Sequence, residues 1–206
     1  MQAAKITEHD IAALASGLRE DLSKEIGRIG TRLPLRELIA FLHRRDGLVV
    51  RERILGRDVA GMIRFGEGSG EITLDQAIAI SPMASFTLAH EVGHWLLHRD
   101  HGNELVTLRR DLRTSPNPLE HQANRFAVHL LMPADLIQAE FNRRYGTASQ
   151  VFAEQAPGMQ ERWARRRDYS KFKATKGQHI SVPSLVEEFG VSPAAMAIRL
   201  EELGLV

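Results

Sequence analysis

Two histidines and a glutamate near the middle of the chain have the residue types and spacing of a metal site. The segment His90-Glu91-Val92-Gly93-His94 places two imidazoles four residues apart. Residues four apart lie on one face of a helix, so both rings can bind one cation. Glu91 lies one position around the helix, where its carboxylate can reach the water that such a cation would activate. The pattern predicts metal-assisted hydrolysis with Glu91 as general base.

A helix is predicted around this motif from independent signals. Ser81 followed by Pro82 is an N-cap residue with proline at the first helical position, and the expected helix runs to about His98. A glycine inside a helix costs about 1 kcal/mol relative to alanine. Close packing of the helix near a metal would justify Gly93 at that cost. The alternative is a polar helix face with surface histidines, since so short a motif also arises by chance.

A catalytic zinc site needs a third protein ligand and one open coordination position. Our candidate for the third ligand is Glu120, near the start of a second helix expected from Asn117-Pro118 to Met132. The alternative is that Glu120 satisfies its own helix end, because Asn117 and Glu120 have the spacing of a capping box.

His98 competes for the third position because it continues the stripe of His90 and His94. At about 1.5 Å of rise per residue it lies about 12 Å along the helix axis from His90, too far for all three rings to converge easily. We therefore expect His98 to orient a ligand or to pack. The remaining histidines of this region are expected to be surface or core residues: His101, His121 and His129.

Composition restricts the class of protein. The 206 residues are 43% hydrophobic and 26% charged, with a net charge of +1, which is typical of a globular chain and gives no argument for nucleic-acid binding. The absence of cysteine excludes disulfide scaffolds, thiol nucleophiles and cysteine zinc sites. The charged N-terminal segment is no signal peptide, and no apolar run reaches the length of a membrane span. We expect a cytoplasmic protein without a membrane partner.

The elements around the motif predict an α+β fold. Apolar residues at helical spacing indicate a helix over residues 11–26, and a shorter one begins near Pro34. Glycine-punctuated β-rich runs follow. We expect a small, mostly antiparallel three-stranded sheet packed on helices. The expected parts are N-terminal helices at 1–45, a metal-binding core at 46–135 and a helical region at 136–206. The three β-rich runs are residues 48–55, 60–65 and 71–75.

The C-terminal residues 181–205 have the pattern of a helix-turn-helix-like module. Residues 181–206 carry one basic residue, Arg199, and four glutamates. This charge balance opposes phosphate contact and favours a packing or protein-docking module over DNA binding. Upstream lies a basic cluster, which we interpret as a solvated face, with DNA or an acidic substrate as the alternative partner. Its members are Arg162, Arg165, Arg166, Arg167, Lys171, Lys173 and Lys176.

Together the motifs resemble the bacterial ImmA/IrrE family of metallopeptidases. The resemblance is carried by FTLAHEVGHWLLH at 86–98, EHQANRFA at 120–127 and LLMP at 130–133. It implies a minimal zincin core of the gluzincin type, with His90, His94 and Glu120 as metal ligands and Glu91 as the general base. Members of this family cleave a partner transcriptional repressor in stress responses or mobile elements.

The expected function is therefore that of a zinc-dependent endopeptidase acting on a helix-turn-helix repressor. Mn²⁺ or Fe²⁺ would also suit the ligand set. The alternatives are a non-catalytic, metal-binding transcription regulator and a toxin–antitoxin component that acts by protein binding. The group that stabilises the oxyanion is not selected by the sequence. Its candidates are Arg125, Tyr145, Tyr169 and His179.

Overall fold

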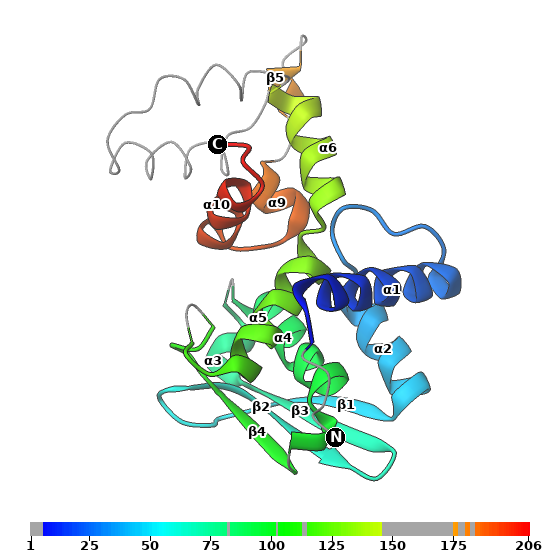
Figure 1. Cartoon of the computed structure of the whole chain (residues 1–206), viewed down its shortest axis with the longest axis vertical. Helices are drawn as coiled ribbons and strands as arrows, with labels where there is room; N and C mark the ends of the chain where they lie inside the picture. The colour runs from blue at the N-terminus through cyan, green and yellow to red at the C-terminus, as the bar shows by residue number, and fades with distance from the viewer. Residues whose placement is uncertain are drawn as a thin grey trace. The chain divides into compact units, whose positions relative to one another are not determined.

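The computed structural model, shown in Figure 1, describes residues 6–81, 83–101, 103–112, 115–145, 175–176, 180–181 and 184–206. The chain divides into two units, Met1–Leu131 and Met132–Val206. The first unit contains both motif helices and the sheet.

Two helices begin the first unit: α1 (Glu8–Ile26) and α2 (Leu35–Asp46). A capping box between Thr7 and Asp10 fixes the start of α1. α2 ends at Gly47, whose left-handed conformation (φ 65°) turns the chain directly into the first strand. Both helices predicted from the apolar spacing are thus confirmed.

Helix α1 is tied to the C-terminal end of a later helix, α5 (Pro118–Leu131). The buried guanidinium of Arg19 donates to the carbonyls of Leu130 at 2.9 Å and Gly30 at 2.9 Å. At the other end of α1, Glu8 accepts hydrogen bonds from Arg125 and His129 of α5. The N-terminal helix therefore supports α5, which carries one of the predicted site residues.

The sheet differs from the prediction in strand number and direction. Within the described residues it has four strands in the order β1-β3-β2-β4, with β2 antiparallel to both β3 and β4 and β1 parallel to β3. The expected α+β class is confirmed and two of the three strand pairings are antiparallel, but the expected number of three strands is wrong and β1 pairs in parallel. The strands are β1 (Leu48–Arg53), β2 (Val59–Gly66), β3 (Ser69–Asp75) and β4 (Glu104–Leu108).

Both differences come from pairing between distant segments. β2 and β3 form a hairpin, and β1 lies beside β3 rather than beside its neighbour in sequence, so β1 and β3 run in the same direction. β4 lies between the two motif helices in sequence and pairs with β2, whose partners range from Arg64 opposite Glu104 to Val59 opposite Leu108. A run of five residues is too short to show a clear strand pattern, and β4 forms a strand because it pairs with β2.

Helix α4 (Ala84–Leu97) lies across one face of the sheet, as Figure 1 shows, and contacts β2 and β3. Its Trp95 is buried and stacks on Phe65 of β2, with ring centroids 6.0 Å apart. Gly70 of β3 makes room for this ring, since an added Cβ would lie 2.4 Å from Trp95 Cζ3. This packing fixes the distance between α4 and the sheet.

The start of α4 is not the predicted one. Ser81 closes the turn after α3 (Gln76–Ala79), because its hydroxyl donates to the carbonyl of Ile78 and accepts from the amide of Met83. Met83 is the N-cap of α4, so the helix begins later than Ser81. Its end at His98 agrees with the prediction, and a short 3₁₀ turn, η1 (Arg99–His101), follows.

Helices α4 and α5 approach each other closely at Gly93. An added Cβ there would lie 3.1 Å from Phe126 Cδ1 and 3.2 Å from Ala123 Cα. Both contacts are tighter than ordinary van der Waals contact, and Ala123 Cα is backbone that cannot turn away. The expectation that close packing explains Gly93 is confirmed, and the neighbour is α5.

The second unit contains α6 (Ala134–Tyr145), β5 (Thr175–Lys176), β6 (Ile180–Ser181), α9 (Leu185–Phe189) and α10 (Pro193–Glu202). Ser184 and Ser192 cap the last two helices, and Gly190 turns between them with φ 65°. Arg162 to Lys173 of the basic cluster lie outside the described residues. Among the described residues, no helix has both the length and the apolar character needed to cross a membrane.

We expect Gly93→Ala to lower the free energy of unfolding by about 1 kcal/mol, because overpacking against α5 outweighs the gain in helix propensity. The matched control is Gly17→Ala in α1, where an added Cβ meets nothing within 4 Å. That change should stabilise the protein by about 0.5–1 kcal/mol. Urea unfolding of both variants measures the difference. Equal stabilisation by the two changes would contradict the close helix contact.

Candidate metal centre

Three side chains from two helices meet at one point in the first unit. His90 and His94 lie on successive turns of α4, and Glu120 lies in the first turn of α5. His90 Nε2 is 3.0 Å from His94 Nε2 and 3.1 Å from Glu120 Oε2, and His94 Nε2 is 3.3 Å from Glu120 Oε1. All three residues are buried. The group can hold a metal ion.

The spacing of these atoms suits a small cation with nitrogen and oxygen ligands. Zinc ligands lie about 2.0–2.2 Å from the ion, so the corners of a tetrahedral site are about 3.3–3.6 Å apart. The observed separations, from 3.0 to 3.3 Å, are only slightly shorter. Two imidazoles and one carboxylate leave a fourth position open, as in catalytic zinc sites. The same donors suit Fe²⁺ or Mn²⁺, so they do not identify the metal.

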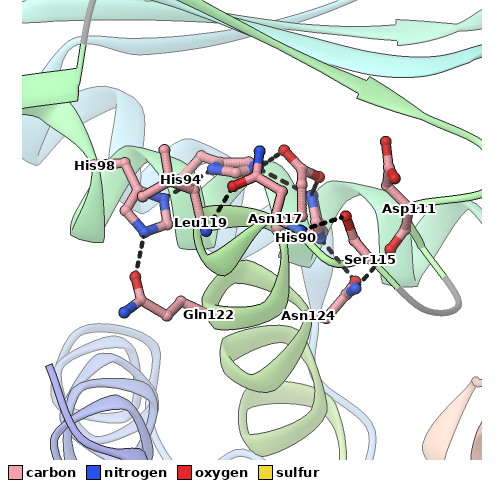
Figure 2. Close-up of polar contacts among 10 residues, drawn as sticks. His90, His94, His98, Asp111, Ser115, Asn117, Leu119, Gln122 and Asn124 are labelled. Atoms are coloured by element: carbon pink, nitrogen blue, oxygen red, sulfur yellow. Dashed lines mark hydrogen bonds and ion pairs between the residues drawn. The ribbon is translucent and has the colours of Figure 1, made fainter.

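The ring of His90 is held from its other side by α5. Its Nδ1 lies 2.9 Å from Asn124 Oδ1, and Asn124 Nδ2 donates to the carbonyl of Asp111 at 2.7 Å. Figure 2 shows His90, Asn124 and Asp111 in this line. Because the amide group must donate to Asp111, its oxygen faces His90 and accepts from Nδ1–H. His90 therefore presents Nδ1–H to Asn124, and its Nε2 is the atom that would bind a metal.

His98 lies behind His94 on the next turn of α4, as Figure 2 shows. Its Nδ1 is 2.8 Å from His94 Nδ1, and its Nε2 is 2.9 Å from Gln122 Oε1. His98 is fully buried. The group that could hold a metal ion consists, among the described residues, of His90, His94 and Glu120, so its third member is the carboxylate. The contacts of His98 suit a residue that orients the ring of His94.

Electrostatics favours the protonation states that metal ligands need. Burial acts to raise the pKa of Glu120, but hydrogen bonds with His90 and His94 outweigh it and lower this pKa to about 2. Burial lowers the pKa of His94, while the carboxylate of Glu120 opposes this effect. At neutral pH Glu120 is ionised and His94 is neutral, as metal binding requires.

Glu91 points toward the sheet beside this group. An added Cβ at Gly61 of β2 would lie 2.6 Å from Glu91 Oε1, so the glycine leaves room for the carboxylate in its present position. Gly61 pairs with Thr107 of β4 in the antiparallel ladder. Among the described residues, neither Glu91 oxygen nor the buried Thr107 hydroxyl has a hydrogen-bond partner of normal geometry, although Thr107 is near enough to influence the pKa of Glu91.

Burial raises the pKa of Glu91 to about 7. The neighbouring His90 and the Thr107 hydroxyl act to lower this pKa, and the charge of Glu120 acts to raise it. A carboxyl group with a pKa near neutrality can both take up and release a proton at physiological pH.

The capping role considered for Glu120 does not occur. Asn117 caps α5 alone, with its Oδ1 accepting from the amide of Leu119 at 3.0 Å, while the Glu120 carboxylate lies at the imidazoles. Figure 2 shows Asn117, Leu119 and Ser115 at this helix start.

The other polar candidates lie outside the group. Arg125 donates to Glu8 of α1, and His129 bonds to the same carboxylate. Tyr145 lies in the second unit, with its ring 4.8 Å from that of Phe141, and His121 is exposed. Tyr169 and His179 lie outside the described residues. None of these residues is assigned as the group that stabilises the oxyanion.

Four residues that contact the group, Glu91 or His98 had no predicted role: Gln122, Asn124, Gly61 and Thr107. Asn124 carried a usable signal, because it lies one turn after Glu120 and asparagine is a poor helix former. The strand pair Gly61 and Thr107 carried none, because its register depends on a distant pairing.

Comparison with protein families agrees with this arrangement. The profile of the family Peptidase M78, described as the IrrE N-terminal-like domain, matches residues 47–201. No curated protein matches the chain. The matched residues include both motif helices and the sheet, and they cover most of the chain. The chain belongs to the Peptidase M78 family of metallopeptidases, as its resemblance to the ImmA/IrrE proteins in the two motif helices indicates.

Proposed function

We propose that this protein is a zinc-dependent endopeptidase that cleaves a partner helix-turn-helix repressor and so relieves repression in a stress response or mobile element. Family membership supports peptide-bond hydrolysis. The group of His90, His94 and Glu120 supports metal binding. The observation that carries the proposal is Glu91, a fully buried carboxyl beside that group without a hydrogen-bond partner of normal geometry among the described residues.

The chemistry divides between the metal and the base. A zinc ion held by His90, His94 and Glu120 would polarise the scissile carbonyl and activate water. Glu91 takes the proton of the attacking water and later delivers it to the leaving amine. Such a residue contributes about 10²–10⁴-fold to the rate.

Glu91 also argues against a purely structural metal site. An ionised carboxylate buried without partners destabilises a fold, because burial removes its hydration. A metal-binding regulator gains nothing from this residue, whereas a hydrolase needs it as a base. The same reasoning applies to a toxin–antitoxin component that acts by binding alone.

The edge strand β4 is the place where we expect the substrate to bind. β4 ends the sheet order, and within the described residues it pairs only with β2. Its Thr107 lies by Glu91. An extended peptide that adds to this edge would use backbone hydrogen bonds and place its carbonyls near the base. Val106 of β4 is 44% exposed and available for side-chain contact.

The C-terminal helices favour protein docking over DNA binding. Arg199 is the basic residue of residues 181–206, and it is buried. Its Nε donates to the carbonyl of Met132 at 3.1 Å, and its Nη1 pairs with Glu202 at 3.1 Å. A guanidinium held in this way is not presented to a phosphate. We infer that α9 and α10 serve packing or repressor docking.

The decisive change is Glu91→Gln. The purified chain, with its bound metals quantified by mass spectrometry, is incubated with the repressor encoded beside it, and cleavage is followed by intact mass. We expect one defined cleavage by wild type and a loss of about 10²-fold or more in the variant with metal retained, because the base alone is removed. Cleavage by Glu91→Gln at the wild-type rate would contradict the assignment of the base. If metal-loaded wild type cleaves neither this repressor nor a proteome-derived peptide library, the endopeptidase proposal is wrong.

The raised pKa of Glu91 predicts a cost in stability. A folded-state pKa of about 7, above the value of 4.5 for a free carboxyl, means that the metal-free protein loses stability as pH rises through this interval. The Glu91→Gln variant lacks this loss. Its free energy of unfolding should exceed that of wild type by up to about 3 kcal/mol near pH 8, and by little near pH 5. The depressed pKa of His94 is common to both proteins and largely cancels. Urea unfolding of the two metal-free proteins at both pH values measures the difference, and a pH-independent difference would count against the buried, partnerless carboxyl.

A further inference from the structure

Each imidazole of the metal group is linked by hydrogen bonds to a side chain of α5, one directly and the other through a third residue. His90 contacts Asn124 directly, whereas His94 contacts His98, which in turn contacts Gln122. We propose that His98 and Gln122 are positioning residues, a relay that fixes the tautomer of His94 and thereby sets the affinity of the site for zinc. This inference rests on the metal site of the proposed function.

The contacts of the relay are short, and both of its imidazole rings are buried. His94 Nδ1 and His98 Nδ1 are 2.8 Å apart, and His98 Nε2 is 2.9 Å from Gln122 Oε1. Both rings are 0% exposed, and their centroids are 5.0 Å apart. A buried ring nitrogen that faces its neighbour with the wrong protonation has no water to bond to instead, so the direction of each hydrogen bond matters.

Only one direction of the relay leaves His94 able to bind a metal. A neutral imidazole carries one N–H, and the ligand atom, His94 Nε2, must be without it. His94 Nδ1–H therefore donates to His98 Nδ1. His98 then carries its proton on Nε2 and donates it to the amide oxygen of Gln122. In the opposite direction His94 Nε2 would bear the proton and could not bind the ion.

The terminal acceptor thus decides the tautomer of a ring that it does not touch. Gln122 Oε1 accepts the proton of His98 and so leaves His98 Nδ1 as an acceptor for His94. Asn124 does the same for His90 in one step, with its amide orientation set by the carbonyl of Asp111. α5 therefore supplies Glu120 to the site and also sets the proton positions on both rings from α4.

A packing role alone does not explain His98. An apolar ring would fill the same space between the helices without two buried nitrogens that need partners. The imidazole is useful because it accepts on one nitrogen and donates from the other. This distinction gives the experiment its logic, because phenylalanine preserves the ring and removes both functions.

The test measures the zinc dissociation constant of the full chain by competition with a chromogenic chelator, which needs no peptidase substrate. We expect His98→Phe and Gln122→Leu each to weaken zinc binding about 10–100-fold. Gln122→Glu keeps an acceptor oxygen and should bind zinc at least as tightly as wild type. The double variant His98→Phe/Gln122→Leu should be no weaker than His98→Phe alone, because Gln122 acts through His98.

His121→Phe is the matched control, since it removes an exposed histidine next to Glu120 and should leave zinc binding unchanged. Far-UV circular dichroism and thermal unfolding verify that each metal-free variant is folded. If His98→Phe fails to fold, the pair Gln122→Leu and Gln122→Glu decides, because the Gln122 side chain is only half-buried.

Wild-type affinity in folded Gln122→Leu, or equal losses in Gln122→Leu and Gln122→Glu, would overturn the relay while leaving the metal site intact. Failure of wild type to bind zinc would overturn the metal site and the relay together. Nitrogen-15 NMR of the zinc-loaded protein gives a second readout: His94 should carry its proton on Nδ1 and His98 on Nε2. The reverse assignment would contradict the proposal.

Discussion

The close approach of α4 and α5 at Gly93 is the contact on which the candidate site depends. Two of its three ligand side chains come from α4 and the third from α5. A small cation accepts ligands only within a few tenths of an ångström of the right distance. The backbone of α4 at Gly93 packs directly against the Ala123 backbone and the Phe126 side chain of α5, and this contact fixes the distance between the helices. α1 holds the far end of α5 through Arg19.

Polar side chains lie behind the candidate ligands, between the same two helices. It leads from the carbonyl of Asp111 through Asn124 to His90, and from His94 through His98 to Gln122. Burying so many nitrogens and oxygens is unfavourable unless each has a partner. Here the partners are present, and their geometry also orients the rings. The same bonds that satisfy the polar groups therefore prepare them for a cation.

Glu91 differs from these imidazoles in its hydrogen bonding. Its carboxylate is as buried as the imidazoles but has no comparable partner among the described residues, and its pKa is raised to about 7. The sheet contributes to this environment, because Gly61 of β2 leaves space for the carboxyl and Thr107 of β4 lies near it. Such an unfavourable group persists where function requires it, since a fold under no other constraint would replace it. The helices thus bring together the candidate metal ligands, and the sheet lies beside Glu91.

Helical spacing, capping residues and turn signals in the sequence predicted most helices of the first unit and the three candidate ligands. Helical spacing brought His90 and His94 to one face, the second motif supplied Glu120, and capping residues with proline placed the start of α5. The sequence also predicted α1, α2 and three strands, because each shows its own periodicity or turn signal. The start of α4 was wrong, since Ser81 serves the preceding turn. Only the tertiary structure decided the rest: the parallel pairing of β1 with β3, the strand β4, the cover over Glu91, and the contacts of His98 and Asn124 with α5. Each joins segments distant in sequence, and the residues that allow it, such as Gly61 and Thr107, show no periodicity, because their roles exist only once the two strands are paired.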